Sequence, residues 1–357
     1  MNATTQDIAL LEQLYKDRAP YHGQLHDHAA TGGRSDGKCT LTQWKEGLEE
    51  LSLDFTTILD HRQVRHMHLP EWDERMFIGG TEPGTTIKDS KAEVPQMHYL
   101  MIFPKHEQLE ALLTEFEEYE FGGAPDGEYR YRHFTVERFG LLIDAIRRLG
   151  GMFVHPHPKQ VMVSDDPLDY WFRDDTGLEV FYTCHEDLDG DQTAANYKLW
   201  TDLLALGKRV WACCSNDEHR NASHKAIVTV YAEERLNVSY MEHLRIGDFV
   251  CGGVGIRMCI GDIPMGGHGD FAGKRLVFSV SDFHKAYSDT THTYRMDLLD
   301  DTGVIFSSKV DPAQKVYFAR DVDNSRKFYR VEIFDETRNV RIAIGNPIWN
   351  TNIEEAK

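Results

Sequence analysis

Short strand-like runs alternate with amphipathic helical patterns over the first two thirds of the chain, and this alternation constrains the fold more than any other feature. Each run has the length and the β-branched or aromatic content of a buried strand. Strand–helix alternation repeated this often predicts a parallel α/β sheet or barrel. The seven runs cover residues 21–26, 55–60, 76–81, 97–103, 151–155, 178–182 and 209–214.

The helical patterns between these runs have apolar residues at helical spacing and recognisable ends. Over 41–51 the apolar residues recur every three or four positions, and Thr40 before them is typical of a helix N-cap. A second pattern covers 109–116. The patterns over 135–149 and 193–206 are each followed by a glycine, which favours helix termination. We expect a helix at each of these four places.

Beyond about residue 224 the pattern changes to strands that are separated by turn residues. One short helix is expected at 239–244, and the remainder is typical of a β-sandwich. We therefore predict two domains, an α/β domain over residues 1–225 and a smaller, sandwich-like all-β domain over residues 226–357. The expected strands of the second domain include 226–231, 275–280, 293–299, 315–319 and 328–334.

Most of the strand-like runs in the first part contain, or are followed by, a histidine or an acidic residue. In a parallel α/β barrel the carboxyl ends of the strands meet on one face, so these side chains would gather there. Imidazoles and carboxylates bind first-row divalent metals, and this set exceeds the four ligands of one closed site. The pattern therefore predicts a site for two or three ions. The histidines and acidic residues at these positions are His26, His28, Asp60, His61, Glu82, His98, His155, Asp217 and His219.

Single histidines are weak indicators of a metal site, because most histidines lie at the surface or in a satisfied core position. The interpretation depends on the order and placement of the whole set. Asp60 also fits a strand-end carboxylate that binds no metal. Five other histidines are expected to bind no metal: His66, His68, His106, His133 and His185. Outside the predicted set, His66 and His157 are the strongest candidates for a further ligand.

The ordered set resembles the PHP (polymerase and histidinol phosphatase) metallohydrolases, in which four motifs surround a metal cluster. The resemblance spans roughly residues 20–222. It implies a distorted seven-stranded (β/α)7 barrel and adds Asp36 to the ligands. The matching segments are Leu25-His26-Asp27-His28, Ser35-Asp36-Gly37, Leu59-Asp60-His61, Gly80-Thr81-Glu82, His98-Tyr99-Leu100, Val154-His155-Pro156 and Ser215-Asn216-Asp217-Glu218-His219.

The resemblance implies a role for each ligand, with two to three ions of manganese, iron or zinc. One ion is implied at His26, His28, Glu82 and Asp217, a second at Glu82, His98 and His155, and a third at Asp36, His61 and His219. We expect Glu82, Asp217 and His219 also to take part in catalysis. His157 offers a competing imidazole, but the apolar strand before His155 and the proline after it favour His155.

The function implied is hydrolysis of a phosphomonoester or phosphodiester of a small molecule through a metal-bound hydroxide. Arg62, Arg65 and Arg220 lie beside ligand motifs, where they fit either phosphate binding or surface salt bridges. The β-rich tail around 343–349 is similar to that of the CehA/McbA-like branch, which includes carbamate and ester hydrolases. A carbamate or carboxyl-ester hydrolase is therefore the alternative, favoured by a pocket of Trp72, Tyr99 and Trp171. A noncatalytic module whose tail binds carbohydrate or a partner is a third interpretation.

Charge and composition add expectations about partners and location. The formal net charge of −19, from 58 acidic and 39 basic residues, repels polyanions, so no nucleic-acid partner is expected. No run approaches the ~18 apolar residues of a membrane span, so no membrane is expected either. The first 20 residues lack the apolar core of a secretory signal, which favours a cytoplasmic protein. The expected partner is a small-molecule substrate, and a homo-oligomer is left open.

Overall fold

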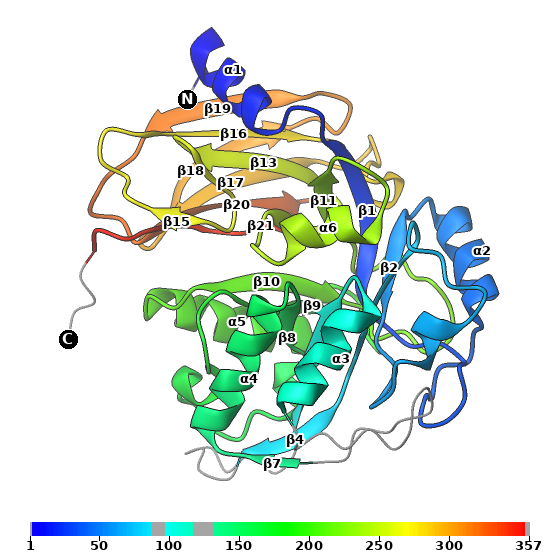
Figure 1. Cartoon of the computed structure of the whole chain (residues 1–357). Helices are drawn as coiled ribbons and strands as arrows, with labels where there is room; N and C mark the ends of the chain where they lie inside the picture. Colours follow the sequence, from blue (N-terminus) through cyan, green and yellow to red (C-terminus); the bar gives the residue numbers. More distant parts are fainter. Residues whose placement is uncertain (1, 88–96, 117–131, 354–357) are drawn as a thin grey trace.

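One large sheet of 15 strands forms the centre of a mixed α/β structure (Figure 1). The structure is a computed structural model and describes residues 2–87, 97–116 and 132–353. The first half of this sheet has the order β10-β9-β8-β6-β3-β2-β1. Each of the seven strand-like runs contributes a strand to it, which confirms that part of the sequence prediction. These strands are β1 (Ala19–Asp27), β2 (Phe55–Ile58), β3 (Phe77–Thr81), β6 (Leu100–Phe103), β8 (Met152–His155), β9 (Thr176–Tyr182) and β10 (Val210–Ser215).

Strand β6 departs from the parallel arrangement that the alternation predicted. It pairs antiparallel with both β3 and β8, whereas β1–β2, β2–β3, β8–β9 and β9–β10 are parallel. Parallel neighbours need a crossover connection, usually a helix. Between β3 and β6 the described chain contains only the short strands β4 (Gly84–Ile87) and β5 (Met97–His98). These two pair with β7 (Arg132–Phe134) in a separate three-stranded sheet.

The two ends of this strand series come together where the chain leaves β1 and β10. Asp27 and Glu218 form an isolated parallel bridge, and the backbone N–H of His28 donates to the Glu218 carbonyl over 2.9 Å. The contact brings the residues that follow β10 beside the end of β1. Closure of the seven strands into a complete barrel stays a prediction.

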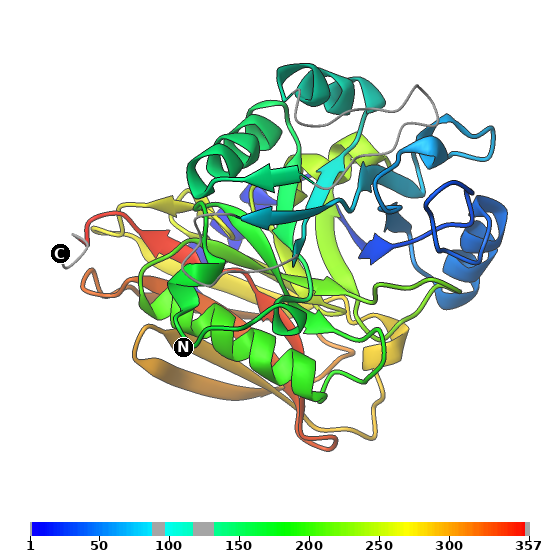
Figure 2. The same ribbon diagram turned by 90° about the horizontal axis from the view of Figure 1, so that it is seen from below.

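Some of the helices begin at a residue whose side chain caps the helix. The Thr40 side chain accepts a hydrogen bond from the backbone N–H of Gln43, and Thr135 does the same for Arg138, as expected of N-caps. Figure 2 shows helices around the outside of the strands of the first half. No helix within the described ranges is long and apolar enough to cross a membrane. The helices are α1 (Thr5–Leu14), α2 (Leu41–Leu51), α3 (His106–Glu115), α4 (Val136–Arg148), α5 (Asp191–Ala205) and α6 (Asn237–Leu244), with short 3-10 turns η1 (Arg65–His68), η2 (Pro158–Gln160), η3 (Pro167–Tyr170) and η4 (Lys285–Tyr287).

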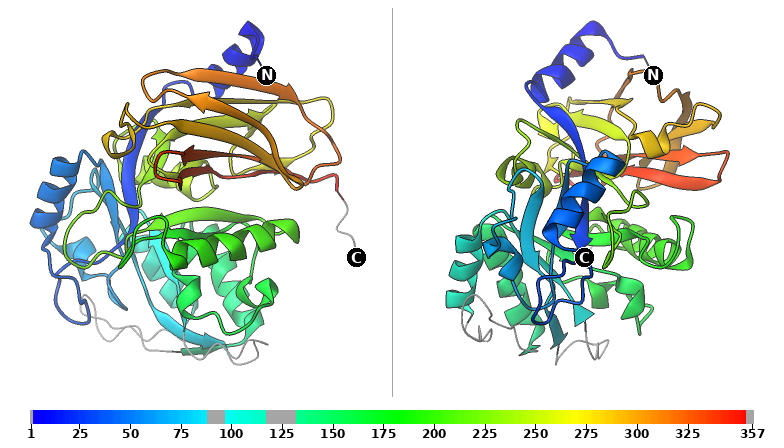
Figure 3. Two further views of the ribbon diagram at one scale, coloured as in Figure 1. Left: turned by 180° about the vertical axis from the view of Figure 1, so that it is seen from behind. Right: turned by 90° about the vertical axis from the view of Figure 1, so that its right-hand side faces the viewer.

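The C-terminal part consists of two stacked layers of strands plus α6 (Figure 3). One layer continues the main sheet, and the other is a four-stranded sheet of order β14-β13-β16-β19. The strands of the first layer are β11 (Val228–Ala232), β12 (Phe249–Gly252), β15 (His268–Gly269), β17 (Tyr294–Asp300), β18 (Gly303–Val310), β20 (Phe328–Asp335), β21 (Val340–Gly345) and β22 (Ile348–Asn350). Those of the second are β13 (Gly255–Ile260), β14 (Ile263–Pro264), β16 (Arg275–Ser281) and β19 (Val316–Asp321).

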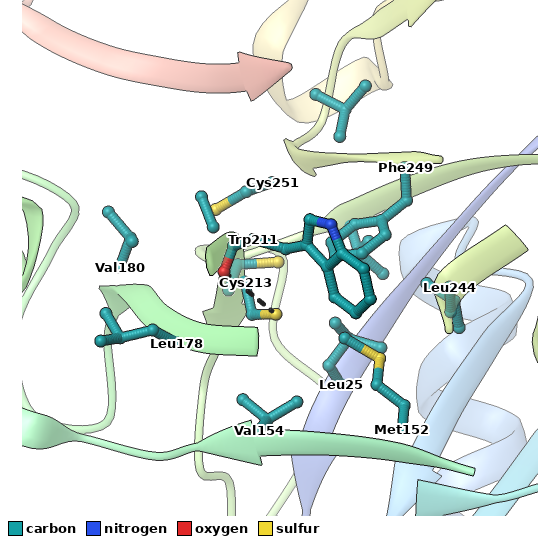
Figure 4. Close-up of a cluster of buried hydrophobic side chains, with 14 of the residues drawn as sticks. Leu25, Met152, Val154, Leu178, Val180, Trp211, Cys213, Leu244, Phe249 and Cys251 are labelled. Carbon is teal, nitrogen blue, oxygen red and sulfur yellow. Dashed lines mark hydrogen bonds between the residues drawn. The ribbon is translucent and has the colours of Figure 1, made fainter. Parts of the chain in front are cut away.

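Backbone pairing and a shared core join the two halves of the chain. Strand β1 pairs antiparallel with β11, from Ala19 opposite Ala232 to Gly23 opposite Val228. Buried side chains of β1, β8, β9 and β10 pack in one cluster with those of α6 and β12, as Leu25, Trp211 and Phe249 illustrate (Figure 4). The division at residues 225 and 226 stays a prediction, and any such boundary cuts through a continuous sheet.

The partly buried histidine His22, which lies where β1 meets β11, makes stability depend on pH. Its Nδ1 is 3.0 Å from Thr229 Oγ1, and its ring centroid is 5.2 Å from that of His284. Burial, and then the nearby charge of His284, lower the pKa of His22 from 6.5 to about 4, although Asp282 opposes this. The folded state therefore keeps His22 neutral while the unfolded chain takes up a proton below pH 6.5.

We expect His22 to reduce the free energy of unfolding as the pH falls from 6.5 towards 4, by about 1.4 kcal/mol per pH unit. Urea unfolding of the wild type and of His22→Gln at pH 6.5 and 5 measures this effect. The wild type should lose about 2 kcal/mol more than the variant over this interval. Equal losses in the two proteins would contradict the assignment.

Candidate metal centre

The candidate ligands are carried by the ends of several strands and by the loops that follow them. His26 belongs to β1 and His28 follows it, Glu82 directly follows β3, and Asp217 follows β10 by two residues. His61 and Glu82 form an isolated parallel bridge, which sets the ends of β2 and β3 side by side. Strand ends that lie next to each other in one sheet thus bring residues from distant parts of the sequence to one place.

Glu82 lies at the centre of the site and is 1% exposed. Its Oε2 is 3.3 Å from His26 Nε2, 3.4 Å from His28 Nε2 and 3.0 Å from His61 Nδ1. Its Oε1 is 2.8 Å from His98 Nδ1. One buried carboxylate therefore has imidazoles on both of its oxygens, as a bridging ligand would.

Asp217 lies on one side of Glu82 and has a left-handed backbone with φ of 47°. Its Oδ1 is 3.1 Å from His28 Nε2 and 3.6 Å from His26 Nε2. Its Oδ2 accepts a hydrogen bond of 2.7 Å from the hydroxyl of Tyr182. The tyrosine therefore fixes the orientation of the carboxylate and leaves Oδ1 directed at the imidazoles.

Asp36 lies on the outer side of the site, with a side chain that is 49% exposed. Its Oδ2 is 3.2 Å from His219 Nε2 and 3.6 Å from His61 Nε2, and its Oδ1 is 4.0 Å from His28 Nδ1. The loop that carries it is held by Asp60, which accepts hydrogen bonds from the backbone N–H of Ala29 and from two loop hydroxyls. The site is thus closed on the side of the buried histidines and open on the side of Asp36.

The ligand atoms form three overlapping groups, within each of which they lie at most 4.8 Å apart. Of the nine ligands that the resemblance implies, all but His155 belong to these groups. His28 and His61 each occur in two groups, as does Glu82. The groups are His26, His28, Glu82 and Asp217; His61, Glu82 and His98; and His28, Asp36, His61 and His219.

Divalent cations fit this arrangement. Four buried polar atoms of the residues around Glu82 have no hydrogen-bond partner among the described residues: His26 Nε2, His28 Nδ1, Glu82 Oε2 and His157 Nδ1. Unpartnered buried polar atoms are costly, and coordination of a cation removes that cost. Two donor atoms at about 2.1 Å from one tetrahedral ion lie about 3.4 Å apart. The separations of 3.1–3.6 Å between the His26, His28, Glu82 and Asp217 atoms match this value.

The charges of the site hold its carboxylates ionised and several of its imidazoles protonated. Burial raises the pKa of Glu82, but the charges of His26 and His98 outweigh it and hold this pKa well below its ordinary value. Burial likewise opposes protonation of His61, but hydrogen bonds with Asp36 and Glu82 raise its pKa to about 10. The His26 pKa is also raised, because neighbouring carboxylates outweigh its burial. Cations must displace these protons, so metal affinity should weaken as the pH falls.

His155 lies outside the three groups, although the sequence favoured it as a ligand. It is 4% exposed, both of its ring nitrogens lack a hydrogen-bond partner in the described part of the chain, and its ring centroid is 6.5 Å from that of Phe172. Burial, followed by the charge of His157, lowers its pKa to about 3. It lines a small cavity with Tyr170 and Trp171.

His157 occupies the place beside Glu82 that the sequence analysis gave to His155. Its Nε2 is 3.0 Å from Glu82 Oε1. The strand β8 ends at His155, and the backbone at His157 turns into the left-handed region with φ of 30°. The His-Pro-His-Pro sequence shows two candidate imidazoles, and only this local turn decides which one is directed at Glu82.

The sequence analysis missed one acidic residue that holds two of these ligands. Glu179 lies within β9 and is 1% exposed. Its Oε1 is 2.8 Å from His26 Nδ1, and its Oε2 accepts a hydrogen bond of 2.7 Å from the backbone N–H of His157. A charged residue inside the apolar run 178–182 was the signal that could have identified it.

The three arginines predicted to contact substrate differ in their exposure to solvent. Arg62 and Arg65 are half-buried in the loop that follows His61, and Arg220 is exposed next to His219. Their role in substrate binding stays a prediction.

The three aromatic residues of the alternative interpretation have separate environments. Tyr99 is fully buried, and its ring centroid is 5.2 Å from that of Phe139. The ring centroid of Trp72 is 5.3 Å from that of Phe77. Trp171 lies 4.3 Å beneath Lys208 Nζ. These contacts do not unite the three rings in one pocket.

Comparison with known proteins gives similar structures but no family. No family model matches the sequence, and no curated protein matches it. A two-domain protein from Bacteroides vulgatus ATCC 8482 that contains a predicted PHP-like metal-dependent phosphoesterase is 12% identical, covers 93% of this chain and 96% of its own, and has a TM-score of 0.43. A protein from Bifidobacterium adolescentis ATCC 15703 described as a metal-dependent phosphoesterase is 15% identical, with 57% and 89% covered and a TM-score of 0.36. Matches this distant carry no argument about activity.

One expectation about partners was wrong. Endonuclease Q from Pyrococcus furiosus is 14% identical, with 65% of this chain and 57% of that chain covered and a TM-score of 0.41. A second similar structure is Endonuclease Q in complex with a 27-mer duplex substrate that has an abasic lesion at the active site. This finding contradicts the exclusion of nucleic acid from the net charge of −19. Net charge describes the whole chain, whereas bound cations reverse the field at a site.

Proposed function

We propose that this chain is a PHP-type metal-dependent hydrolase that cleaves phosphate esters and holds two to three divalent cations. The observation that carries the proposal is the buried carboxylate of Glu82, whose two oxygens have imidazoles on both sides at 2.8–3.4 Å. A carboxylate shared in this way fits a cluster of ions better than a single closed site. Manganese, iron and zinc all suit ligands of this type.

Each cation would have its own set of ligands, and His157, which lies outside the three groups above but beside Glu82, would belong to one set. His26, His28, Glu82 and Asp217 would hold the most buried ion, and Asp36, His61 and His219 the outermost. Glu82 with His98 and His157 would hold the ion between them. Bound cations stabilise the charge that develops on a transferring phosphoryl group and lower the pKa of water.

The exposure of the ligands indicates where the ester approaches. The side chains of His26, His28 and Glu82 are 0–1% exposed, whereas those of His61, His98 and His219 are 24–27% exposed. The substrate must therefore approach over the outer ligands and Asp36. Tyr182 orients Asp217 from the closed side. We expect the arginines that follow His61 and His219 to bind phosphate oxygens.

A substrate screen tests the proposal. Metal-free protein is loaded with Mn²⁺, Zn²⁺ or Fe²⁺ and assayed on an aryl phosphate, a bis-aryl phosphate, an aryl carbamate, an aryl acetate and a DNA duplex with an abasic site. We expect hydrolysis of at least one of the phosphate esters, the duplex included, that disappears when a chelator removes the metal. Hydrolysis of the carbamate or acetate alone would favour the alternative hydrolase class. Metal binding without hydrolysis of any compound would favour a binding module.

A further inference from the structure

Glu179 makes two contacts that together determine how two imidazoles are presented to Glu82. The carboxylate lies inside β9, is almost completely buried, and uses both of its oxygens. Oε1 is 2.8 Å from His26 Nδ1, and Oε2 accepts the backbone N–H of His157 over 2.7 Å. These two residues come from β1 and from the turn after β8, so Glu179 links separate parts of the site.

The contact with His26 selects one of the two tautomers of the imidazole. A carboxylate can only accept hydrogen bonds, so Nδ1 of His26 must carry the proton. In the neutral ring, which is the form that binds a cation, the lone pair is then on Nε2. This atom lies 3.3 Å from Glu82 Oε2 and 3.6 Å from Asp217 Oδ1 and has no hydrogen-bond partner among the described residues. Nε2 is therefore the atom that is free to bind a cation.

The contact with His157 holds an unusual backbone conformation. The φ of 30° at this residue lies in the left-handed region, which is unfavourable for residues other than glycine. The hydrogen bond from its N–H to Glu179 is buried and stabilises the turn. This turn places His157 Nε2 3.0 Å from Glu82 Oε1.

We infer that Glu179 is a positioning residue of the metal centre, which fixes His26 in the tautomer that binds through Nε2 and holds the turn that directs His157 at Glu82. The inference rests on the proposed metal-binding function. Mutation of a carboxylate that holds a metal-binding histidine in this way typically lowers metal affinity by about 10–100-fold.

Glu179→Gln separates this role from simple packing because it keeps the size of the side chain. The N–H of His157 is a fixed donor, so the single amide oxygen of glutamine must face it. The amide NH₂ group then faces His26 Nδ1 and forces the proton onto Nε2. The variant therefore retains the fold but removes the lone pair that faces Glu82 and Asp217.

Metal titration by equilibrium dialysis with Zn²⁺, followed by elemental analysis, tests the inference. We expect Glu179→Gln to bind its most buried ion at least about 10-fold more weakly than the wild type. Glu186→Gln is the matched control, because Glu186 also accepts backbone N–H groups, from Gln192 and Thr193, but contacts no candidate ligand. The control should keep the affinity of the wild type. Equal affinity in Glu179→Gln and the wild type would overturn the inference.

A second measurement needs no folded variant of Glu179. In Zn²⁺-loaded wild type with ¹⁵N-labelled histidine, NMR should show the His26 ring protonated at Nδ1 and unprotonated at Nε2, with His26→Gln used to assign the resonance. A proton on Nε2 would overturn the inference. Failure of the wild type to bind Zn²⁺ at all would instead refute the proposed function, so the two failures are distinguishable.

Discussion

Glu82→Gln is expected to remove at least one bound cation and to lower turnover by about 10³-fold or more. The substitution keeps the size of the side chain but removes its charge and one good ligand oxygen. Because Oε1 and Oε2 face different imidazoles, the loss affects more than one group of ligands. Elemental analysis, turnover on the phosphate ester found by the screen and the melting temperature are measured together.

The control for this variant is Glu115→Gln. Glu115 is an exposed residue at the end of α3 that pairs with Arg148. It should retain the metal content and turnover of the wild type. Full metal occupancy and near-normal turnover in Glu82→Gln would mean that Glu82 is not the centre of the site.

Glu332→Ala is expected to lower the free energy of unfolding by about 3–5 kcal/mol. Glu332 is 2% exposed, and its carboxylate accepts hydrogen bonds from Arg330 Nε (2.9 Å), Arg341 Nε (2.7 Å) and the hydroxyl of Tyr197 (2.8 Å). Because Tyr197 lies on α5 and the other three residues lie on β20 and β21, this network joins the α/β half to the C-terminal strands. Alanine would leave the buried guanidinium of Arg330 without its carboxylate.

The same carboxylate should make the stabilisation sensitive to acid. Burial raises the pKa of Glu332, but the charges of Arg330 and Arg341 outweigh it and lower this pKa. Its stabilising effect is therefore present above the ordinary value of 4.5 and is lost as the pH falls through the lower, folded-state value.

Urea unfolding at pH 7 measures the effect of Glu332→Ala, with Asp202→Ala as control. Asp202 forms an exposed pair with Lys198 four residues away, so its removal should cost at most about 0.5 kcal/mol. A loss below 1 kcal/mol in Glu332→Ala would show that the network contributes little to the stability of the protein.

The strands, and the gathering of most of the candidate ligands, could be predicted from the sequence because both depend on local patterns. Buried runs such as 178–182 and 209–214 are continuous apolar segments, and strands lie where they were expected. The residues that follow them in the chain must lie near the strand ends. From the expected strand ends alone, His26, His61 and Glu82 were predicted to lie together, and the structure places them together.

The features that could not be predicted depend on contacts between distant segments or on single backbone angles. The antiparallel direction of β6 fits a connection after β3 whose described residues contain no crossover helix, and no period in the sequence reveals this. The pairing of β1 with β11 joins residues about 200 positions apart. The exchange of His155 for His157 depends on one left-handed residue. Glu179 was overlooked because its run was interpreted by its apolar residues alone.

The stoichiometry of bound metal tests the central claim most directly. Metal-free protein is dialysed against a modest excess of Mn²⁺ or Zn²⁺ at pH 7.5, and the bound metal is counted by elemental analysis. The arrangement of Glu82 between its imidazoles predicts two to three equivalents in the wild type and at least one fewer in Glu82→Gln. A wild type that binds no metal or only one equivalent, or a variant that binds as much as the wild type, would contradict the claim.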